Sequence, residues 1–166
     1  MVKPNNLRKV SIARLKQEMQ DTVFLSDDLA ITTIDYLRNP TSEIPVSLDG
    51  FAAMIMMSGS AVLSIDTETY EVRPNMLVFF RPGSIIRTIR CSSDATAYLV
   101  ACSKAFVSDI QVDISASLPI HMRFGRKPCL QVTERDVAEI RQFFQLIKTV
   151  IQSDKERYRK EIIHTL

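Results

Sequence analysis

The chain has 166 residues, of which 46% are hydrophobic, and this content suits one domain with a proper core. Its 21 basic and 19 acidic residues nearly cancel, so the totals do not call for nucleic acid, a membrane surface or a polyacidic substrate as direct partner. Three widely spaced cysteines, with no apolar leader and no apolar run of membrane-spanning length, predict a cytoplasmic protein with reduced thiols and no membrane partner.

Residues 1–22 predict an N-terminal arm that contains one short helix. Ser11 can cap this helix, and Ile12, Leu15 and Met19 follow it at spacings of three and four residues. The arm therefore has a narrow apolar stripe with which it can pack on the domain that follows.

Residues 23–103 predict a β domain, because apolar and polar residues alternate there with a period of two. The runs 61–65 and 69–73 alternate on either side of a polar link and predict a hairpin, and the run 76–80 is apolar throughout, which predicts a strand covered on both faces. Turn signals such as Pro82-Gly83 separate six to eight short strands in all. This regular spacing is typical of a barrel or a sandwich.

Residues 104–166 predict a helical segment. Phe106, Val107 and Ile110 mark a short helix, and the run from Thr133 to Asp136 resembles a capping box that opens a long one. A further helix after residue 153 ends on an apolar position at Leu166, with no glycine cap or trailing proline, so we expect the natural chain to continue.

The long helix carries two neighbouring apolar stripes that together cover about half of its surface. One stripe can pack on the β domain while the other meets the matching helix of a second subunit, which predicts a homodimer. A single helix buried inside a monomer is the alternative. The candidate interface residues are Val137, Ile140, Phe144, Ile147 and Ile151 on the first stripe, and Phe143, Leu146 and Val150 on the second.

A β domain with a Pro-Gly turn suggests the cupin architecture, whose metal sites need two or three histidines and usually a glutamate that face one cavity. The chain has two histidines, His121 and His164, and both lie outside the β region. Ser47, Ala52 and Ile86 stand where we expect such ligands, and none of them is a good one. We therefore predict no metal, no cofactor and no enzymatic activity; the alternative is a metal-dependent cupin isomerase or dioxygenase.

The stretch 50–88, followed by the long helix and the EIIHTL ending, resembles the N-terminal effector-binding and dimerisation domain of AraC-type transcription regulators. The resemblance rests on Gly59, Tyr70, Asn75, the Pro82-Gly83 turn and the 130–133 entry to the helix. It implies a mainly β fold with C-terminal α-helices, in which a cupin-like (jelly-roll) β-barrel holds a small effector without a metal. It also implies a helical dimer interface, and DNA binding only through a C-terminal helix-turn-helix domain that is not in this sequence.

Strand parity and the Pro-Gly turn indicate where an effector would bind. Ile85 and Ile86 follow the turn where several relatives carry polar or histidine residues that contact sugars, so we do not expect a sugar. The alternatives are that the candidates are only barrel core, or that the domain is a purely structural dimerisation module with a filled cavity. The candidate ligand-binding residues are Met54, Met56, Phe80, Ile86, Thr88 and Tyr98.

Overall fold

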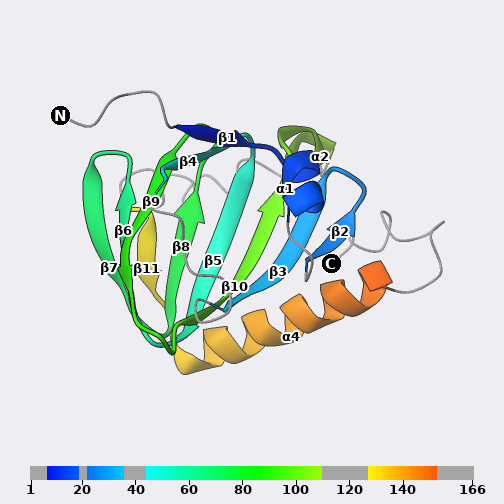
Figure 1. Ribbon diagram of the computed structural model, residues 1–166. Coiled ribbons are helices and arrows are strands. Elements are labelled where there is room, and N and C mark those ends of the chain that lie inside the picture. The colour runs from blue at the N-terminus through cyan, green and yellow to red at the C-terminus, as the bar shows by residue number, and fades with distance from the viewer. Residues whose placement is uncertain (1–6, 19–21, 36–43, 110–126, 153–166) are drawn as a thin grey trace.

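The computed structural model describes residues 7–18, 22–35, 44–109 and 127–152. In this part of the chain the strands form two sheets that face each other, with one helix across the outer side of one sheet (Figure 1). The protein is therefore mainly β and cupin-like, built as a sandwich of two sheets rather than as one closed barrel.

Chain order and sheet order differ strongly, as expected for a jelly-roll arrangement. The five-stranded sheet contains, in spatial order, β1 (Arg8–Val10), β4 (Val46–Leu48), β9 (Ile85–Cys91), β6 (Ala61–Ile65) and β7 (Glu68–Val72). The six-stranded sheet contains β11 (Cys129–Gln131), β8 (Met76–Phe80), β5 (Phe51–Ser58), β10 (Thr96–Cys102), β3 (Leu29–Asp35) and β2 (Val23–Leu25).

The described helices are α1 (Ile12–Glu18), α2 (Lys104–Asp109) and α4 (Glu134–Gln152). Side-chain caps fix the starts of the two short helices. The Ser11 hydroxyl accepts a hydrogen bond from the Arg14 amide at 3.2 Å, and the Ser103 hydroxyl accepts one from the Phe106 amide at 3.0 Å. The predicted N-terminal helix and its cap are thus confirmed.

A reciprocal capping box starts α4. The Thr133 hydroxyl accepts a hydrogen bond from the Asp136 amide at 3.2 Å, and the Asp136 carboxylate accepts one from the Thr133 amide at 2.9 Å. The hydrogen bonds from Thr133 also hold the pKa of Asp136 below its usual value. This confirms the predicted helix start and fixes the direction in which α4 leaves the sandwich.

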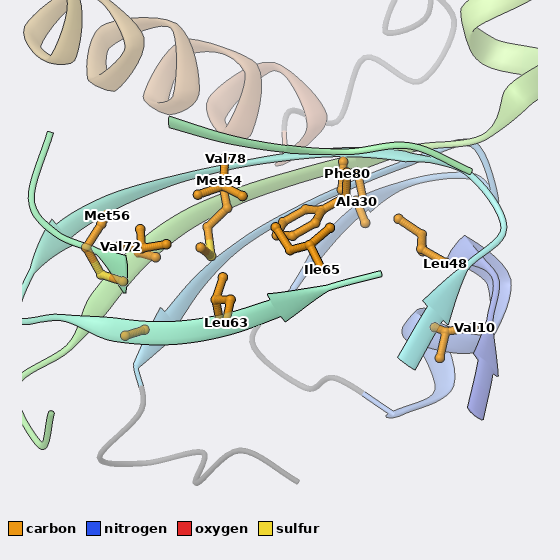
Figure 2. Close-up of a cluster of buried hydrophobic side chains, with 14 of the residues drawn as sticks. Val10, Ala30, Leu48, Met54, Met56, Leu63, Ile65, Val72, Val78 and Phe80 are labelled. Atoms are coloured by element: carbon orange, nitrogen blue, oxygen red, sulfur yellow. The ribbon is translucent and has the colours of Figure 1, made fainter. Parts of the chain in front are cut away.

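The strands separate two apolar clusters. The first lies between the two sheets, and Figure 2 shows it extending from Val10 and Leu48 at one end to Met56 and Val72 at the other. The second lies between the six-stranded sheet and α4, where Phe144 and Ile151 pack. Because side chains alternate along a strand, β10 contributes to both clusters.

Two short strands lie outside the range 23–103 that the sequence analysis assigned to the barrel. β1 comes from the N-terminal arm and pairs in parallel with β4, and β11 follows α2 in the chain and pairs with β8. Each has three residues, too few to show a period in the sequence. The predicted last helix lies outside the described residues. None of the helices in the described part of the chain combines the length and apolar character that a membrane crossing requires.

Candidate functional site

An apolar cavity of about 260 Å³ lies between the two sheets, toward the end of the core where Val10 and Leu48 lie (Figure 2). Of the described residues that line it, all are hydrophobic except Thr88. They come from both sheets, from α1 and from the segment just before β4. The lining residues are Val10, Leu15, Ile34, Ile44, Val46, Leu48, Ala52, Met54, Leu63, Phe80, Ile86, Thr88, Leu99 and Ala101.

A row of three alanines explains why space remains in the six-stranded sheet. Ala101 on β10 pairs with Ala30 on β3 on one side and with Ala52 on β5 on the other. Directly paired residues point to the same face of a sheet, here the face toward the other sheet. Three methyl side chains in a row cannot reach across the roughly 10 Å between packed sheets, so they leave room beneath the side chains opposite.

The Pro82-Gly83 turn positions the facing strand β9. Gly83 has φ 86°, and the Ser84 amide donates a hydrogen bond to the Arg81 carbonyl at 3.1 Å, as in a type II turn with proline and glycine at its centre. The Asp66 carboxylate then accepts a hydrogen bond from the Ile85 amide at 2.9 Å. This anchors the start of β9.

The register of β9 against β6 determines which of its side chains point inward. Ile86 pairs with Ile65 and Thr88 pairs with Leu63, and both partners are buried in the cluster between the sheets. Ile86 and Thr88 consequently face the alanine row across the cavity, where both line the wall.

The structure allows a test of whether a metal fits this cavity. Of the three positions where the sequence suggested metal ligands, Ala52 and Ile86 line its wall together with Val46 and Leu48, whereas Ser47 is buried but is not among the described residues that line it. The side chains of the four lining residues carry no lone pair that could bind a metal ion. Among the described residues there is no group of three His, Cys, Asp or Glu side chains able to hold a metal, and both histidines lie outside these residues. The described residues of the cavity wall do not fit a metal centre.

Two of the three cysteines, Cys102 and Cys129, are not reactive nucleophiles either. Burial raises the pKa of Cys102 to about 11 and that of Cys129 to about 11. At neutral pH both side chains are thiols rather than thiolates, and the thiolate is the reactive form. These two residues therefore act as small hydrophobic side chains of the core.

Four of the six candidate ligand residues meet at the cavity: Met54, Phe80, Ile86 and Thr88. Met56 is fully buried between the sheets but is not among the described residues that line the cavity, and Figure 2 shows it beside Val72 at the far end of the core.

Tyr98 lies on the opposite side of its strand from the cavity. Its ring stacks on the ring of Phe144 in α4, with centroids 4.3 Å apart and an interplanar angle of 9°. The sequence analysis placed Tyr98 on the inner side, which is instead occupied by its neighbours Ala97 and Leu99. Both sides of β10 are apolar, so its inner side could not be identified from its composition, and a one-residue error in parity exchanges the faces.

Sequence reasoning missed most of the cavity wall. The N-terminal arm contributes Val10 and Leu15. The end of β3 contributes Ile34, and the residues just before β4 contribute Ile44. A row of alanines in otherwise large apolar strands is a signal that could have indicated the space, but only once the pairing of β3, β10 and β5 was known.

The two apolar stripes of α4 have different environments. Val137, Phe144 and Ile151 are buried within the chain's own domain, while Phe143 is 50% and Leu146 is 44% exposed. The remaining three predicted interface residues, Ile140, Ile147 and Val150, are half-buried. Val150 of the second stripe also packs on this inner cluster, so the apolar surface left outside consists of Phe143 and Leu146.

The described chain is a cupin-like sandwich with an apolar cavity between its sheets. The chain belongs to the family of AraC-like ligand binding domains, whose sequence profile matches residues 41–165. This confirms the resemblance drawn from the sequence. No curated protein matches the chain in sequence.

Among solved structures, wild-type ToxT from Vibrio cholerae strain SCE256 bound to an unsaturated fatty acid is 10% identical, with 88% of this chain and 52% of that chain covered and a TM-score of 0.47. ToxT from Vibrio cholerae O395 bound to (E)-4-(8-methylnaphthalen-1-yl)but-3-enoic acid is 10% identical, with 83% and 54% covered and a TM-score of 0.45. A putative mannose-6-phosphate isomerase from Ralstonia eutropha JMP134 is 14% identical, with 50% and 82% covered and a TM-score of 0.40. The chain spans about half the length of the ToxT structures.

Proposed function

We propose that this chain is the ligand-sensing and dimerisation domain of a cytoplasmic AraC-type transcription regulator, which binds a small apolar effector without a metal. The apolar cavity of about 260 Å³ carries this proposal, and the family match supports it. DNA would be bound by a helix-turn-helix domain outside these residues.

Strand β10 suggests how binding could be communicated. Leu99 and Ala101 point inward and line the cavity. Their neighbour Tyr98 points to the opposite face of the strand and stacks on Phe144 of α4. A ligand regulates only if its affinity differs between two arrangements of the protein. Because β10 forms part of the cavity wall and also contacts α4, a ligand that shifts β10 would also shift the helix.

A cavity-blocking variant tests the sensor proposal. In Ala101→Leu the larger side chain should occupy part of the cavity, so that an apolar probe such as p-cymene no longer fits. We expect p-cymene to raise the melting temperature of the parent protein and to have no effect on Ala101→Leu, as a ligand stabilises a fold only when it binds it. A parent protein whose melting temperature does not respond to p-cymene at its solubility limit would contradict the proposed cavity function.

The second candidate function is a metal-dependent cupin enzyme, since several structurally similar proteins are cupins and one is named a putative isomerase. The apolar lining argues against it, because no described side chain of the wall can bind a metal. Stoichiometric iron, manganese, nickel or zinc in the purified protein would favour the enzyme and overturn our choice.

The exposed stripe of α4 supports the dimerisation part of the proposal. Phe143 and Leu146 are large apolar side chains on the outer side of a helix whose other stripe is already buried. A matching helix from a second copy would cover both residues. Of the eight predicted interface residues, we therefore retain Phe143 and Leu146 at the centre of the interface.

Charge substitution on α4 tests the dimer. Leu146→Glu places a carboxylate in the proposed interface, so we expect the variant to sediment as a monomer where the parent is a dimer. Gln145→Glu is the matched control, because Gln145 is exposed on a neighbouring side of the same turn, away from the stripe. Sedimentation velocity should show the control unchanged; a Leu146→Glu protein that sediments like the parent would reject this interface.

A further inference from the structure

We infer that the effector is a neutral, largely apolar molecule of about ten non-hydrogen atoms that makes one hydrogen bond, to the hydroxyl of Thr88. This inference rests on the proposed function, since it names the class of ligand for the same cavity. Three properties of the cavity carry it: its volume, the absence of charge from its described wall, and its one polar side chain.

The volume sets the size of the ligand. A closed apolar cavity of about 150 Å³ is large enough for benzene, which has six carbon atoms. In proportion, a cavity of about 260 Å³ takes a molecule of about ten non-hydrogen atoms. The cavity is partly open, since its lining residue Ile44 is 42% exposed, so a larger molecule would have to extend out of it.

The wall sets the charge of the ligand. No described residue of the lining carries a charge, and thirteen of the fourteen are hydrophobic. A carboxylate or phosphate in this cavity would lose hydration without gaining a counter-charge from any described residue of the wall, and that loss exceeds what apolar contacts return. A sugar of the same size would leave most of its hydroxyls without partners.

Thr88 sets the position of the single polar group. Its partner across the sheet, Leu63, is buried and faces the interior, so the Thr88 side chain lies on the inner face of β9. Among the described residues, the hydroxyl of Thr88 has no hydrogen-bond partner. The hydroxyl is not among the described buried polar atoms that lack a partner, so it is open to solvent, and a ligand carbonyl or hydroxyl placed beside it can take the place of water as its partner.

Three probes with the same para-isopropylphenyl body separate the contributions. p-Cymene is apolar, 4-isopropylphenol replaces its methyl group by a hydroxyl of similar size, and 4-isopropylbenzoate carries a negative charge at neutral pH. We would titrate each probe into the parent protein and into Thr88→Val, which keeps the shape of the side chain and removes the hydroxyl. Thr69→Val is the matched control, because Thr69 is exposed on β7 and points away from the cavity.

We expect both neutral probes to bind the parent and the benzoate to bind at least tenfold more weakly than the phenol. In Thr88→Val the affinity for 4-isopropylphenol should fall about fivefold while that for p-cymene stays unchanged, because one neutral hydrogen bond has about this effect. Thr88→Ser should restore part of the lost affinity, and Thr69→Val should bind all three probes like the parent.

The outcomes distinguish this inference from the proposed function. If neither neutral probe binds the parent, the cavity is not a ligand site and the proposed function fails. If p-cymene binds but Thr88→Val leaves the affinity for 4-isopropylphenol unchanged, the cavity function survives and the role of Thr88 is wrong. Benzoate binding as tight as phenol binding would overturn the neutral class of ligand.

Discussion

The two sides of strand β10 are equally apolar, yet one side is filled by the protein and the other leaves a cavity. On the outer side the ring of Tyr98 stacks on the ring of Phe144, 4.3 Å away. On the inner side Ala101 lies in a row with two other alanines, and a space of about 260 Å³ remains above it. Hydrophobicity alone therefore does not separate core from binding site; the size of the side chains that face each other does.

The difference also separates two kinds of energetic role. Side chains on the outer side keep α4 in place, so their removal should be felt in the stability of the fold. Side chains around the cavity belong to the core between the sheets but also border empty space, so a larger side chain there should be felt first in ligand affinity.

Removal of the Phe144 ring should lower the stability of the fold more than any other change predicted here. Phe144 is 3% exposed and stacks on Tyr98, so Phe144→Ala should lower the free energy of unfolding by about 3–5 kcal/mol, as large-to-small changes in a packed core do. Phe143→Ala is the matched control, with all proteins compared in the Leu146→Glu background that removes the proposed dimer: the same substitution one residue earlier then removes a ring that is 50% exposed, and should cost less than about 1 kcal/mol.

Urea unfolding measures these differences in the free energy of unfolding. Sedimentation should first show that both variants and the parent are in the same oligomeric state. Equal losses for Phe143→Ala and Phe144→Ala would mean that α4 is not packed on its own sheet as described. The contrast between the filled and the open side of β10 would then have no basis.

Loss of the capping box at the start of α4 should lower the stability of the fold by a smaller amount, and this amount should depend on pH. The pKa of Asp136 in the folded protein lies below its usual value of 3.8 because Thr133 donates hydrogen bonds to the carboxylate. The carboxylate therefore stabilises the fold above the unfolded pKa, and this contribution is lost as the pH falls through the folded pKa.

The variant Asp136→Asn should melt below the parent at neutral pH, and the two melting temperatures should converge as the pH drops below 3.8. Glu134→Gln, which removes a charge from the same helical turn but not this hydrogen bond, should show a smaller dependence on pH. The affinity for p-cymene should not change in Asp136→Asn, because the cap lies on the helix and not on the cavity wall. A gap between parent and variant that persists at acid pH would contradict the assigned role of the carboxylate.

Local chemistry made several elements predictable. The reciprocal bonds of Thr133 and Asp136 depend on residues three apart, and the turn at Gly83 depends on a proline and a glycine in sequence. The predicted hairpin of 61–65 and 69–73 also follows from local alternation, and β6 and β7 do pair in antiparallel register, with Ala61, Leu63 and Ile65 buried. Such features need only neighbouring residues, so the sequence contains all the information that they require.

The assignment of Tyr98 shows where this kind of reasoning ends. A strand with apolar residues on both sides has no period that identifies its inner face, so its parity is fixed only by what packs on each side. The arm residues Val10 and Leu15 could not be assigned to the cavity at all, because they reach it through the pairing of β1 with β4 and the packing of α1.

The mainly β character, the caps and turns, the stripes of α4 and the lack of histidines in the β region follow from the sequence alone. Each of them is a property of composition or of residues that are close together in the chain. Only the tertiary structure decided that three alanines from β3, β5 and β10 lie side by side, and that the space above them belongs to a wall with Thr88 as its one polar described residue. A cavity is a volume that no side chain fills, and such a volume exists only after segments distant in the chain have been brought together.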